Sequence, residues 1–176
     1  MALLTVLAVG GLYDLLGDEL KPSDYFLAFL PLAHILELVV EIALSFYGMT
    51  TGYGRIKTLT DASVRNCLGD IRAFRPTLMV GVPAVWESIR KGIVGKVNQS
   101  GVLRRSLFNA ALSIKRADVP ILKGIVDSVV FSQVREQVGG RLRLALSGGS
   151  AISRETQEFL SLALVQVIQG ASDNIV

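Results

Sequence analysis

Short apolar runs alternate along the chain with longer segments in which apolar and polar residues recur at helical spacing. Four of the runs are rich in branched, aromatic or small apolar residues and are bounded by proline, glycine or polar turns. Such runs are typical of strands that are buried on both faces of a sheet. We therefore predict strands at residues 25–30, 77–82, 141–146 and 164–169.

The segments between these runs carry the start and stop signals of helices. Asp61 and Ser153 are favourable N-cap residues, and Pro83 suits the first turn of a helix. The pair Gly139-Gly140 predicts a helix end. We expect helices at residues 34–46, 61–74, 83–97, 103–116 and 121–138, and one more that begins at Ser153.

One or more predicted helices separate each strand from the next, and residues 47–59, whose three glycines predict a loop with room for one short strand, lie between the first two helices. This alternation favours an α/β fold: a layered, mostly parallel sheet with flanking helices. No internal repeat, low-complexity tract or interdomain linker interrupts the pattern.

Composition narrows the class of protein. The chain has 176 residues, of which 51% are hydrophobic and 19% charged, and this balance excludes a disordered chain. One cysteine, Cys67, and one histidine, His34, exclude a disulfide scaffold and a metal site built on these residue types. The net charge is only +3 and no run of Lys or Arg stands out, so we expect no nucleic-acid partner.

Two apolar segments raise the question of a membrane. Residues 1–13 are apolar, but no basic residues precede them, so we predict no signal peptide. Residues 25–49 are long enough to span a bilayer, yet Glu37 and Glu41 lie near the middle, where a carboxylate is costly. A buried strand, a turn at Pro31 and a helix explain this segment better than a transmembrane helix does.

Ligands of parallel α/β sheets bind where strands end and helices begin. Three loops meet that description, at residues 31–34, 81–83 and 147–152, and a fourth follows Gln169. Glycine in such loops lets the backbone N–H groups approach a ligand. The turn Ser147-Gly-Gly-Ser150 alone leaves two interpretations open, because many strand-to-helix turns contain glycine for steric reasons.

Several polar residues have a structural interpretation beside a functional one. His34 could begin a helix and bond a nearby backbone group, and Trp86 and Cys67 fit buried core positions. Glu37 and Glu41 could form a paired-carboxylate site, but a solvated helix face or a basic partner explains them as well. The basic cluster also has two interpretations, a solvated helix face or a surface that contacts a membrane; it consists of Arg104, Arg105, Lys115 and Arg116.

The order of four motifs carries a family resemblance. The motifs are Leu30-Pro-Leu-Ala-His-Ile-Leu-Glu37, Tyr53-Gly54 with Lys57-Thr-Leu-Thr60, Arg75-Pro-Thr77 with Gly81-Val-Pro-Ala-Val-Trp-Glu87, and Leu146-Ser-Gly-Gly-Ser-Ala-Ile-Ser153. With them the chain resembles the long-chain fatty acid–CoA ligases of the adenylate-forming, or AMP-binding, superfamily, of the fungal and other eukaryotic type. The resemblance extends over about residues 12–170.

The resemblance implies an overall reaction. Such ligases activate a long-chain fatty acid with Mg²⁺ and ATP to an acyl-adenylate, and coenzyme A then displaces AMP. They have a large layered N-terminal domain and a small mobile C-terminal domain. Residues 1–176 would then be a partial AMP-binding domain without the phosphate loop and the C-terminal domain, and we expect no tight binding of ATP, Mg²⁺ or coenzyme A to this chain alone.

The resemblance also assigns residues. It places His34 between the acyl and adenylate pockets, and Val82 and Pro83 near the acyl tunnel. The adenylate-binding positions it implies are Gly148, Gly149, Ser150, Gln169 and Gly170. It assigns no catalytic residue and no metal ligand within this chain.

One departure from the family follows Gly170. The family reads Tyr-Gly-Leu-Thr-Glu there, whereas this sequence has Ala171 to Ile175 without an aromatic residue or a glutamate. We therefore expect no ligase activity from the chain alone, and whether it acts as an enzyme stays open. A non-catalytic acyl-chain binding module and a partner of a full-length synthetase are the alternatives.

The resemblance also implies a partner and a cellular location. The partner would be a long-chain fatty acid, with room for peripheral membrane association. The location would be intracellular, at the cytosolic face of the endoplasmic reticulum, a lipid droplet or a peroxisome.

Overall fold

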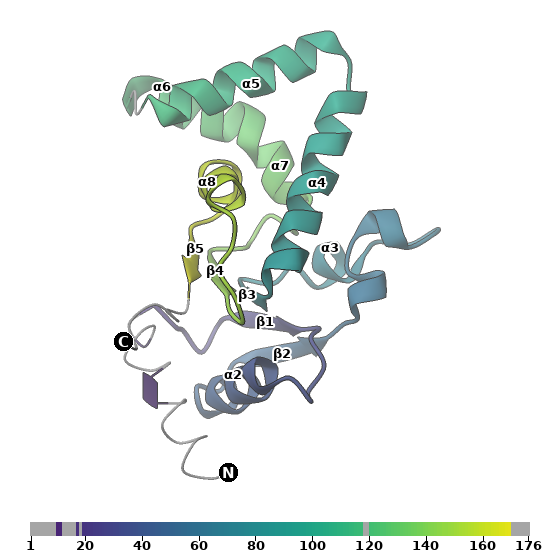
Figure 1. Cartoon of the computed structure of the whole chain (residues 1–176), viewed down its shortest axis with the longest axis vertical. Coiled ribbons are helices and arrows are strands. Elements are labelled where there is room, and N and C mark those ends of the chain that lie inside the picture. The colour runs from purple at the N-terminus through teal and green to yellow at the C-terminus, as the bar shows by residue number, and fades with distance from the viewer. Residues whose placement is uncertain (1–9, 12–16, 18, 118–119, 170–176) are drawn as a thin grey trace.

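The computed structural model describes residues 10–11, 17, 19–117 and 120–169. Within these residues five strands form one sheet in the order β2-β1-β3-β4-β5, and every neighbouring pair is parallel (Figure 1). The strands are β1 (Tyr25–Ala28), β2 (Thr50–Tyr53), β3 (Leu78–Gly81), β4 (Leu144–Ser147) and β5 (Val167–Gln169). The expected α/β class and all four predicted strands are confirmed, and β2 is the short strand for which residues 47–59 left room.

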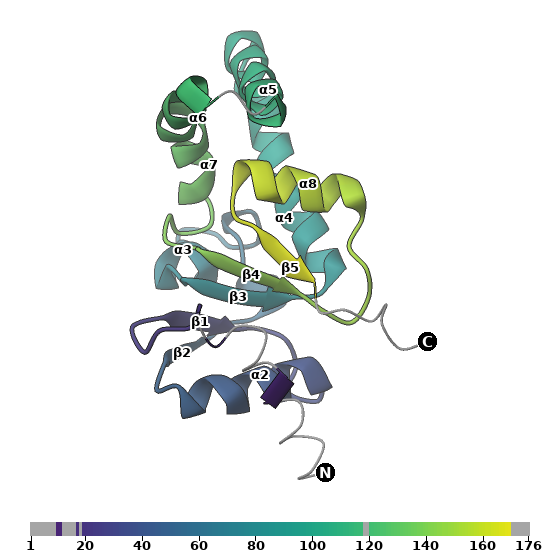
Figure 2. The same ribbon diagram turned by 90° about the vertical axis from the view of Figure 1, so that its left-hand side faces the viewer.

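Both faces of the sheet are buried, as the apolar runs predicted. Phe26 of β1 packs toward α2 (Ile35–Phe46), and Leu27 packs toward α4 (Pro83–Gln99) and α8 (Arg154–Ala163). Figure 2 shows α2 on one side of the sheet and α4 with α8 on the other. The sheet is therefore the middle of three layers, and successive strand residues enter different cores.

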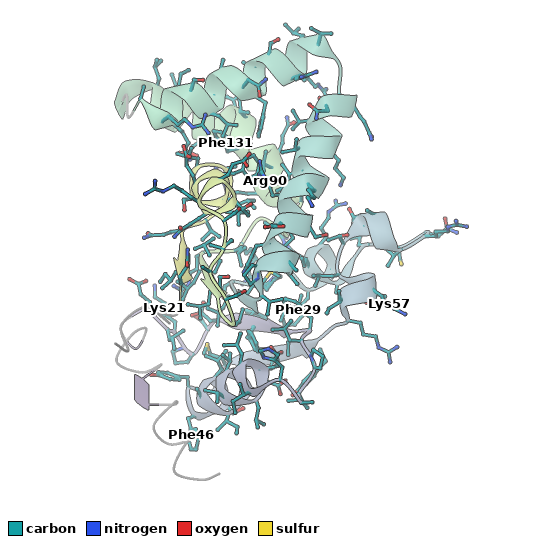
Figure 3. All side chains as sticks on the ribbon, in the orientation of Figure 1. Lys21, Phe29, Phe46, Lys57, Arg90 and Phe131 are labelled. Carbon is teal, nitrogen blue, oxygen red and sulfur yellow. The ribbon has the colours of Figure 1, made fainter. Side chains whose placement is uncertain are left out.

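A further group of helices lies beyond α4 and α8. It consists of α5 (Val102–Arg116), α6 (Pro120–Val126), the π-helical segment η3 (Asp127–Phe131) and α7 (Ser132–Glu136). Phe131 lies among these helices, far from Phe29 at the sheet (Figure 3), and its ring meets Phe108 edge-on with centroids 5.8 Å apart. The predicted helix at 121–138 is thus a helical stretch with a π turn inside it, and Gly139 and Gly140 end it at positive φ, as expected.

The prediction of one helix over residues 61–74 is wrong. The segment forms a short 3₁₀ turn, η2 (Asp61–Ser63), and a separate helix, α3 (Asp70–Phe74). Instead of capping a helix, the Asp61 carboxylate accepts a hydrogen bond from the Gly69 backbone at 2.8 Å and pairs with Arg72 at 2.5 Å. A Cβ on Gly69 would lie 2.4 Å from the backbone of Thr60. The backbones of Gly69 and Thr60 therefore pack directly against each other and close the loop between them.

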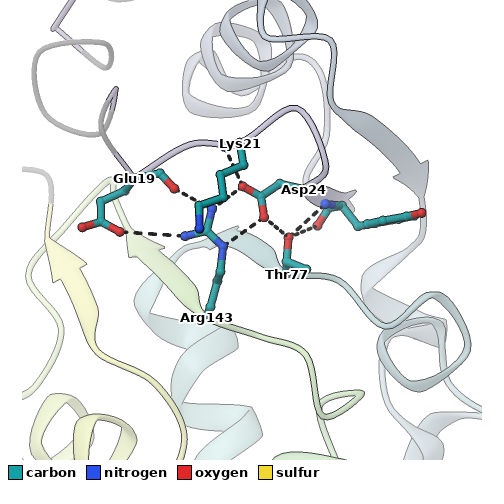
Figure 4. Close-up of polar contacts among 6 residues, drawn as sticks. Glu19, Lys21, Asp24, Thr77 and Arg143 are labelled. Atoms are coloured by element: carbon teal, nitrogen blue, oxygen red, sulfur yellow. Dashed lines mark hydrogen bonds and ion pairs between the residues drawn. The ribbon is translucent and has the colours of Figure 1, made fainter.

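A buried polar cluster joins the segment before β1 to β3 and β4 (Figure 4). Asp24 is buried and pairs with Arg143 through both carboxylate oxygens. Its Oδ1 also accepts a hydrogen bond from Thr77 Oγ1 at 2.7 Å, and Oδ2 accepts one from the Lys21 backbone at 2.9 Å. Burial acts to raise the pKa of Asp24, but the hydrogen bonds from Arg143, Thr77 and Lys21 outweigh it and hold the pKa below its ordinary value of 3.8.

We expect Asp24→Asn to lower the free energy of unfolding by about 2–3 kcal/mol, because it removes the buried carboxylate that pairs with Arg143 and leaves Arg143 only the longer ion pair with the exposed Glu19, at 3.8 Å. The stabilisation by Asp24 is present above its ordinary pKa and is lost as the pH falls, so the variant should lose less stability than the wild type in acid. Denaturant unfolding between about pH 3 and 7 measures both effects. The matched control is Glu158→Gln, which removes the more exposed Arg116–Glu158 pair and should cost less than about 1 kcal/mol. Equal losses in the two variants would contradict the role of the cluster.

Candidate functional site

The carboxyl ends of three strands lie side by side at one edge of the sheet. Gly81 of β3 is in register with Ser147 of β4, and Ser147 is in register with Gln169 of β5. Because the strands are parallel, the loops that follow them leave the sheet at the same edge. We call this edge, with the loops at 29–34, 82–83 and 148–153, the strand-end edge.

The glycine turn after β4 makes close contacts with two other elements. The Gly148 N–H donates to the Gly81 carbonyl at 3.1 Å, which ties the turn to the end of β3. A Cβ on Gly148 would lie 2.9 Å from a methyl group of Leu36 at the start of α2. Gly149 has φ +87°, and a Cβ there would lie 3.8 Å from Val82. The turn therefore requires glycine at position 149 for its left-handed conformation, whereas a side chain at position 148 would have to displace the end of the Leu36 side chain.

The start of α8 fixes the far end of that turn. Ser153 is the N-cap, and its Oγ accepts a hydrogen bond from the Thr156 backbone at 3.3 Å, as the sequence predicted. Gly149 and Ser150 stay exposed between the strand and this cap. Backbone N–H groups at the turn and the Ser150 hydroxyl are thus accessible to a ligand.

His34 is the N-cap of α2. Its Nδ1 accepts a hydrogen bond from the Leu36 backbone at 3.3 Å, and its own N–H donates to the Pro31 carbonyl at 2.8 Å. The structural interpretation of His34 is therefore confirmed. An accepting Nδ1 corresponds to the tautomer that is protonated on Nε2, so the exposed imidazole still offers a donor to a ligand.

Val82 and Pro83 form the turn between β3 and α4. Val82 is the N-cap of α4, Pro83 occupies its first turn, and both are half-buried. Trp86 lies one turn further on, is buried in the core as expected, and donates from Nε1 to the Leu146 carbonyl at 3.2 Å. This bond ties α4 to the end of β4, which holds the turns after β3 and β4 next to each other.

Glu37 is the main residue at this edge that the sequence interpretation misplaced. It is fully buried, whereas a solvated helix face or a basic partner was expected. Neither carboxylate oxygen has a well-formed hydrogen bond. Burial, with the nearby charge of Glu41, raises its pKa to about 7, although the backbone of Phe29 and Leu30 favours the charged form. The spacing of Glu37, Val40 and Leu44 does contain the signal, because i, i+3 and i+7 share one helix face.

Three other expectations need correction or refinement. Cys67 is exposed and not a core residue. Among the described residues Glu41 pairs with no basic side chain, and its carboxylate accepts a hydrogen bond from the Tyr53 hydroxyl at 3.2 Å. Lys115 does not lie on a solvated face, since its ammonium is largely buried, pairs with Asp127 at 2.7 Å and lies over the Phe131 ring. Arg104 and Arg105 are exposed, as predicted.

The structure thus gathers most of the predicted positions at the strand-end edge. The turn at Gly148 and Gly149 approaches Leu36, at the start of α2, through Gly148, and Val82 through Gly149. Gln169 is half-buried and in register with Ser147, and Gly170 lies outside the described residues. Within the described part of the chain, cavities of about 560, 330 and 200 Å³ lie along α4, and no predicted site residue lines any of these three. At the strand-end edge, His34, Gly149 and Ser150 are exposed.

Within the described part of the chain, no group of three or more His, Cys, Asp or Glu residues could hold a metal ion. None of its helices combines the length and the apolar character that crossing a bilayer requires.

Comparison with known proteins agrees with this geometry. The family model of the AMP-binding enzymes matches residues 3–171. The chain is 46% identical over 166 residues to a palmitoyl-CoA ligase of Gibberella moniliformis, covering 92% of this chain and 24% of the relative. It is 48% identical over 157 residues to long-chain-fatty-acid–CoA ligase 1 of Schizosaccharomyces pombe, covering 86% and 23%. The chain thus spans about a quarter of the length of these relatives.

Solved structures agree on the fold. The adenylation domain of a carboxylate reductase from Mycobacterium chelonae matches with a TM-score of 0.56 at 20% identity, over 85% of this chain and 21% of that one. The N-terminal domain of FACL13 from Mycobacterium tuberculosis matches with a TM-score of 0.53 at 16% identity, over 88% and 28%. Both similarities support the layered parallel α/β architecture.

The buried carboxylate at this edge gives a testable pH dependence. Because the folded state raises the pKa of Glu37 from 4.5 to about 7, its contribution to stability is complete below pH 4.5 and is lost as the pH rises through 7. We expect Glu37→Gln to remove this loss and to be more stable than the wild type above pH 7, by on the order of 1–3 kcal/mol. Denaturant unfolding from about pH 5 to 8.5 measures the difference.

Glu87→Gln on α4 is the matched control, because it makes the same chemical change on a half-buried helix position. It should leave the slope of stability against pH unchanged. Parallel curves for the wild type and Glu37→Gln would show that Glu37 does not titrate in this range.

Proposed function

The chain belongs to the AMP-binding enzyme family, and we propose that it serves the ATP-dependent conversion of a long-chain fatty acid to its coenzyme A thioester. In this reaction the fatty acid carboxylate attacks the α-phosphorus of ATP and pyrophosphate leaves. The thiol of coenzyme A then attacks the acyl carbonyl, and AMP leaves. The names of the two fungal relatives support this substrate class, and the reaction of the whole relatives is a proposal for a chain that spans about a quarter of their length.

The observation that carries the proposal is the glycine turn at the strand-end edge. A side chain at Gly148 would have to displace the end of the Leu36 side chain, and Gly149 adopts a left-handed conformation beside Val82. A flat nucleobase needs such close access to backbone groups, and the adjoining N–H groups and the Ser150 hydroxyl can bind polar atoms of an adenylate. The turn thus fits the position that the resemblance implies for the adenylate.

The acyl side of the edge is apolar. Leu32 and Ile35 flank His34 and are more than half exposed. Val82 and Pro83 lie across the glycine turn from them. In the proposed arrangement these side chains contact the first part of the acyl chain, and the His34 imidazole orients the carboxylate between the acyl and adenylate sides.

The described residues offer candidate contacts for the adenylate, but none is assigned to Mg²⁺ or to coenzyme A. In the proposed arrangement the glycine turn binds the adenylate half of ATP, and Gln169, in register with Ser147, contacts it. Bound Mg²⁺ would neutralise the phosphates of ATP, and we assign it no residue of the described part, in which no three His, Cys, Asp or Glu side chains cluster. For coenzyme A we assign no residue.

The setting follows from the substrate class. A long-chain fatty acid is the proposed partner, and we place the protein at the cytosolic face of an intracellular membrane, such as the endoplasmic reticulum, a lipid droplet or a peroxisome. A non-catalytic acyl-binding module would use the same apolar side of the edge, and ligase assays separate it from the proposed function.

A chimeric enzyme tests the proposal directly. Residues 20–169 replace the matching segment of the Schizosaccharomyces pombe ligase, to which the chain is 48% identical. We expect the chimera to form palmitoyl-CoA, and His34→Ala to lower kcat/KM by about tenfold or more through loss of substrate orientation. A folded chimera that makes no palmitoyl-CoA would contradict the proposed function.

The control variant separates the two roles of His34. His34→Asn keeps a side-chain acceptor for the Leu36 N–H, and so keeps the N-cap, but removes the imidazole. If the imidazole orients substrate, His34→Asn is as slow as His34→Ala while its unfolding curve matches the wild type. Full activity of His34→Asn would leave His34 only its capping role.

The 176-residue polypeptide by itself should form no palmitoyl-CoA from palmitate, ATP, Mg²⁺ and coenzyme A. Positioning and neutralising the triphosphate provides much of the catalysis in such reactions. The segment after Gly170 lacks the aromatic residue and the glutamate that the resemblance requires. A radiolabelled palmitate assay measures this, and turnover clearly above a no-protein control would contradict it.

A further inference from the structure

Glu37 places a carboxyl group in a core where its neighbours are apolar. It is fully buried in the first turn of α2, and neither of its oxygens has a well-formed hydrogen bond. The next positions on the same face of α2, Val40 and Leu44, are apolar and pack against the sheet. A leucine at position 37 would continue that pattern and would avoid burying a polar group without a good partner. Because this position costs stability at the edge of a candidate site, it indicates a role other than packing.

The surroundings of Glu37 connect it to the loop at residues 29–34. The polar groups that favour its charged form are the backbone N–H groups of Phe29 and Leu30, at the start of that loop. The loop ends at His34, the N-cap of α2, whose Nδ1 accepts a hydrogen bond from the Leu36 N–H at 3.3 Å. The carboxyl group of Glu37 thus acts on the first residues of the loop, while its own helical turn holds the last one.

The titratable groups around Glu37 do not compensate its charge. Glu41, one turn further along α2, repels it. On β2, the Glu41 carboxylate raises the pKa of Tyr53 above its ordinary value of 10, so the Tyr53 hydroxyl stays neutral near pH 7. From β3 and β4 the sheet contributes buried apolar side chains to this core, which are Leu78, Val80, Leu144 and Leu146. The charge of Glu37 therefore acts chiefly on the backbone of the loop.

We propose that Glu37 is a positioning residue of the strand-end edge, whose buried carboxyl group fixes the loop at residues 29–34 and thereby the place of the His34 imidazole. An ionised carboxylate attracts the N–H groups of the loop, whereas the protonated acid carries no charge and attracts them less. The loop therefore has two arrangements, and the proton on Glu37 selects between them. Leu36 extends the effect to the glycine turn, because its side chain lies beside Gly148.

Nuclear magnetic resonance of the full 176-residue chain tests the proposal without substrate. His34 is the only histidine, so its imidazole signals are identified directly. The wild type is compared with Glu37→Gln, whose amide resembles the protonated acid. We expect the His34 signals of the two proteins to coincide at about pH 5 and to differ at about pH 8.5, where Glu37 is charged. Protons that His34 itself binds are present in both proteins, so the comparison isolates Glu37.

Glu41→Gln is the matched control, because it removes the same charge from the same helix. It should keep the pH-dependent change of the His34 signals and move its midpoint to lower pH, since Glu41 helps to raise the pKa of Glu37. If His34 responded only to the charge of the helix, Glu41→Gln and Glu37→Gln would give similar signals at every pH. That result, or His34 signals that are identical in the wild type and Glu37→Gln throughout, would overturn the proposal.

Amide hydrogen exchange measures the order of the loop end itself. In Glu37→Leu, which removes the carboxyl group and keeps an apolar side chain, the Leu36 N–H that bonds His34 should exchange about tenfold faster. The matched bond in the same chain joins the Thr156 N–H to Ser153 Oγ, also at 3.3 Å, at the start of α8, and its exchange should not change. Equal acceleration at both amides would indicate a general loss of stability and contradict the proposal, and so would an unchanged Leu36 amide.

The chimeric enzyme tests whether Glu37 acts through His34, a readout that rests on the proposed function. We expect Glu37→Leu to lower kcat/KM by about tenfold, but by less than about twofold when His34→Ala is already present. Losses that multiply would show that Glu37 acts independently of His34 and would overturn the proposal. A folded chimera without activity would instead contradict the proposed function, and the resonance and exchange measurements then decide the role of Glu37 by themselves.

Discussion

The parallel register of β3, β4 and β5 is the constraint on which the rest of the structure depends. It sets Gly81, Ser147 and Gln169 in one row, so the segments that follow these strands leave the sheet together. The backbone bond from Gly148 to Gly81 and the bond from Trp86 to the Leu146 carbonyl hold that row in place. A shift of one residue would turn buried side chains to the wrong core and separate the loops of the candidate site.

The two buried carboxylates, Asp24 and Glu37, differ in their hydrogen-bond partners, and their pKa values are shifted in opposite directions. Asp24 has a guanidinium, a hydroxyl and a backbone N–H as partners, and its pKa is low. Glu37 is buried at the start of α2 without a well-formed hydrogen bond, and its pKa is high. The first joins the segment before β1 to the sheet, whereas the second is a source of instability beside the residues that hold the glycine turn.

The molecule also has two ends with different properties. The strand-end edge combines glycine backbone, a histidine and apolar side chains, which suits a small amphipathic ligand such as an acyl-adenylate. At the other end, α5, α6 and η3 expose large apolar side chains: Leu103, Leu107, Ile125 and Val129. Helix α4 connects the two ends.

The sequence alone determined the features that depend on local interactions. Apolar runs located the strands, and Pro83, Ser153 and Gly139-Gly140 located helix ends, because these signals act within one turn of the chain. Family motifs indicated the residues of the strand-end edge. Tertiary structure decided what depends on distant partners: the loop that Asp61 closes with Gly69 and Arg72, the pairing of β2 with β1, the burial of Glu37, and the contact between Gly148 and Leu36. These energies arise only when segments far apart in the sequence are packed together, so a local pattern cannot specify them.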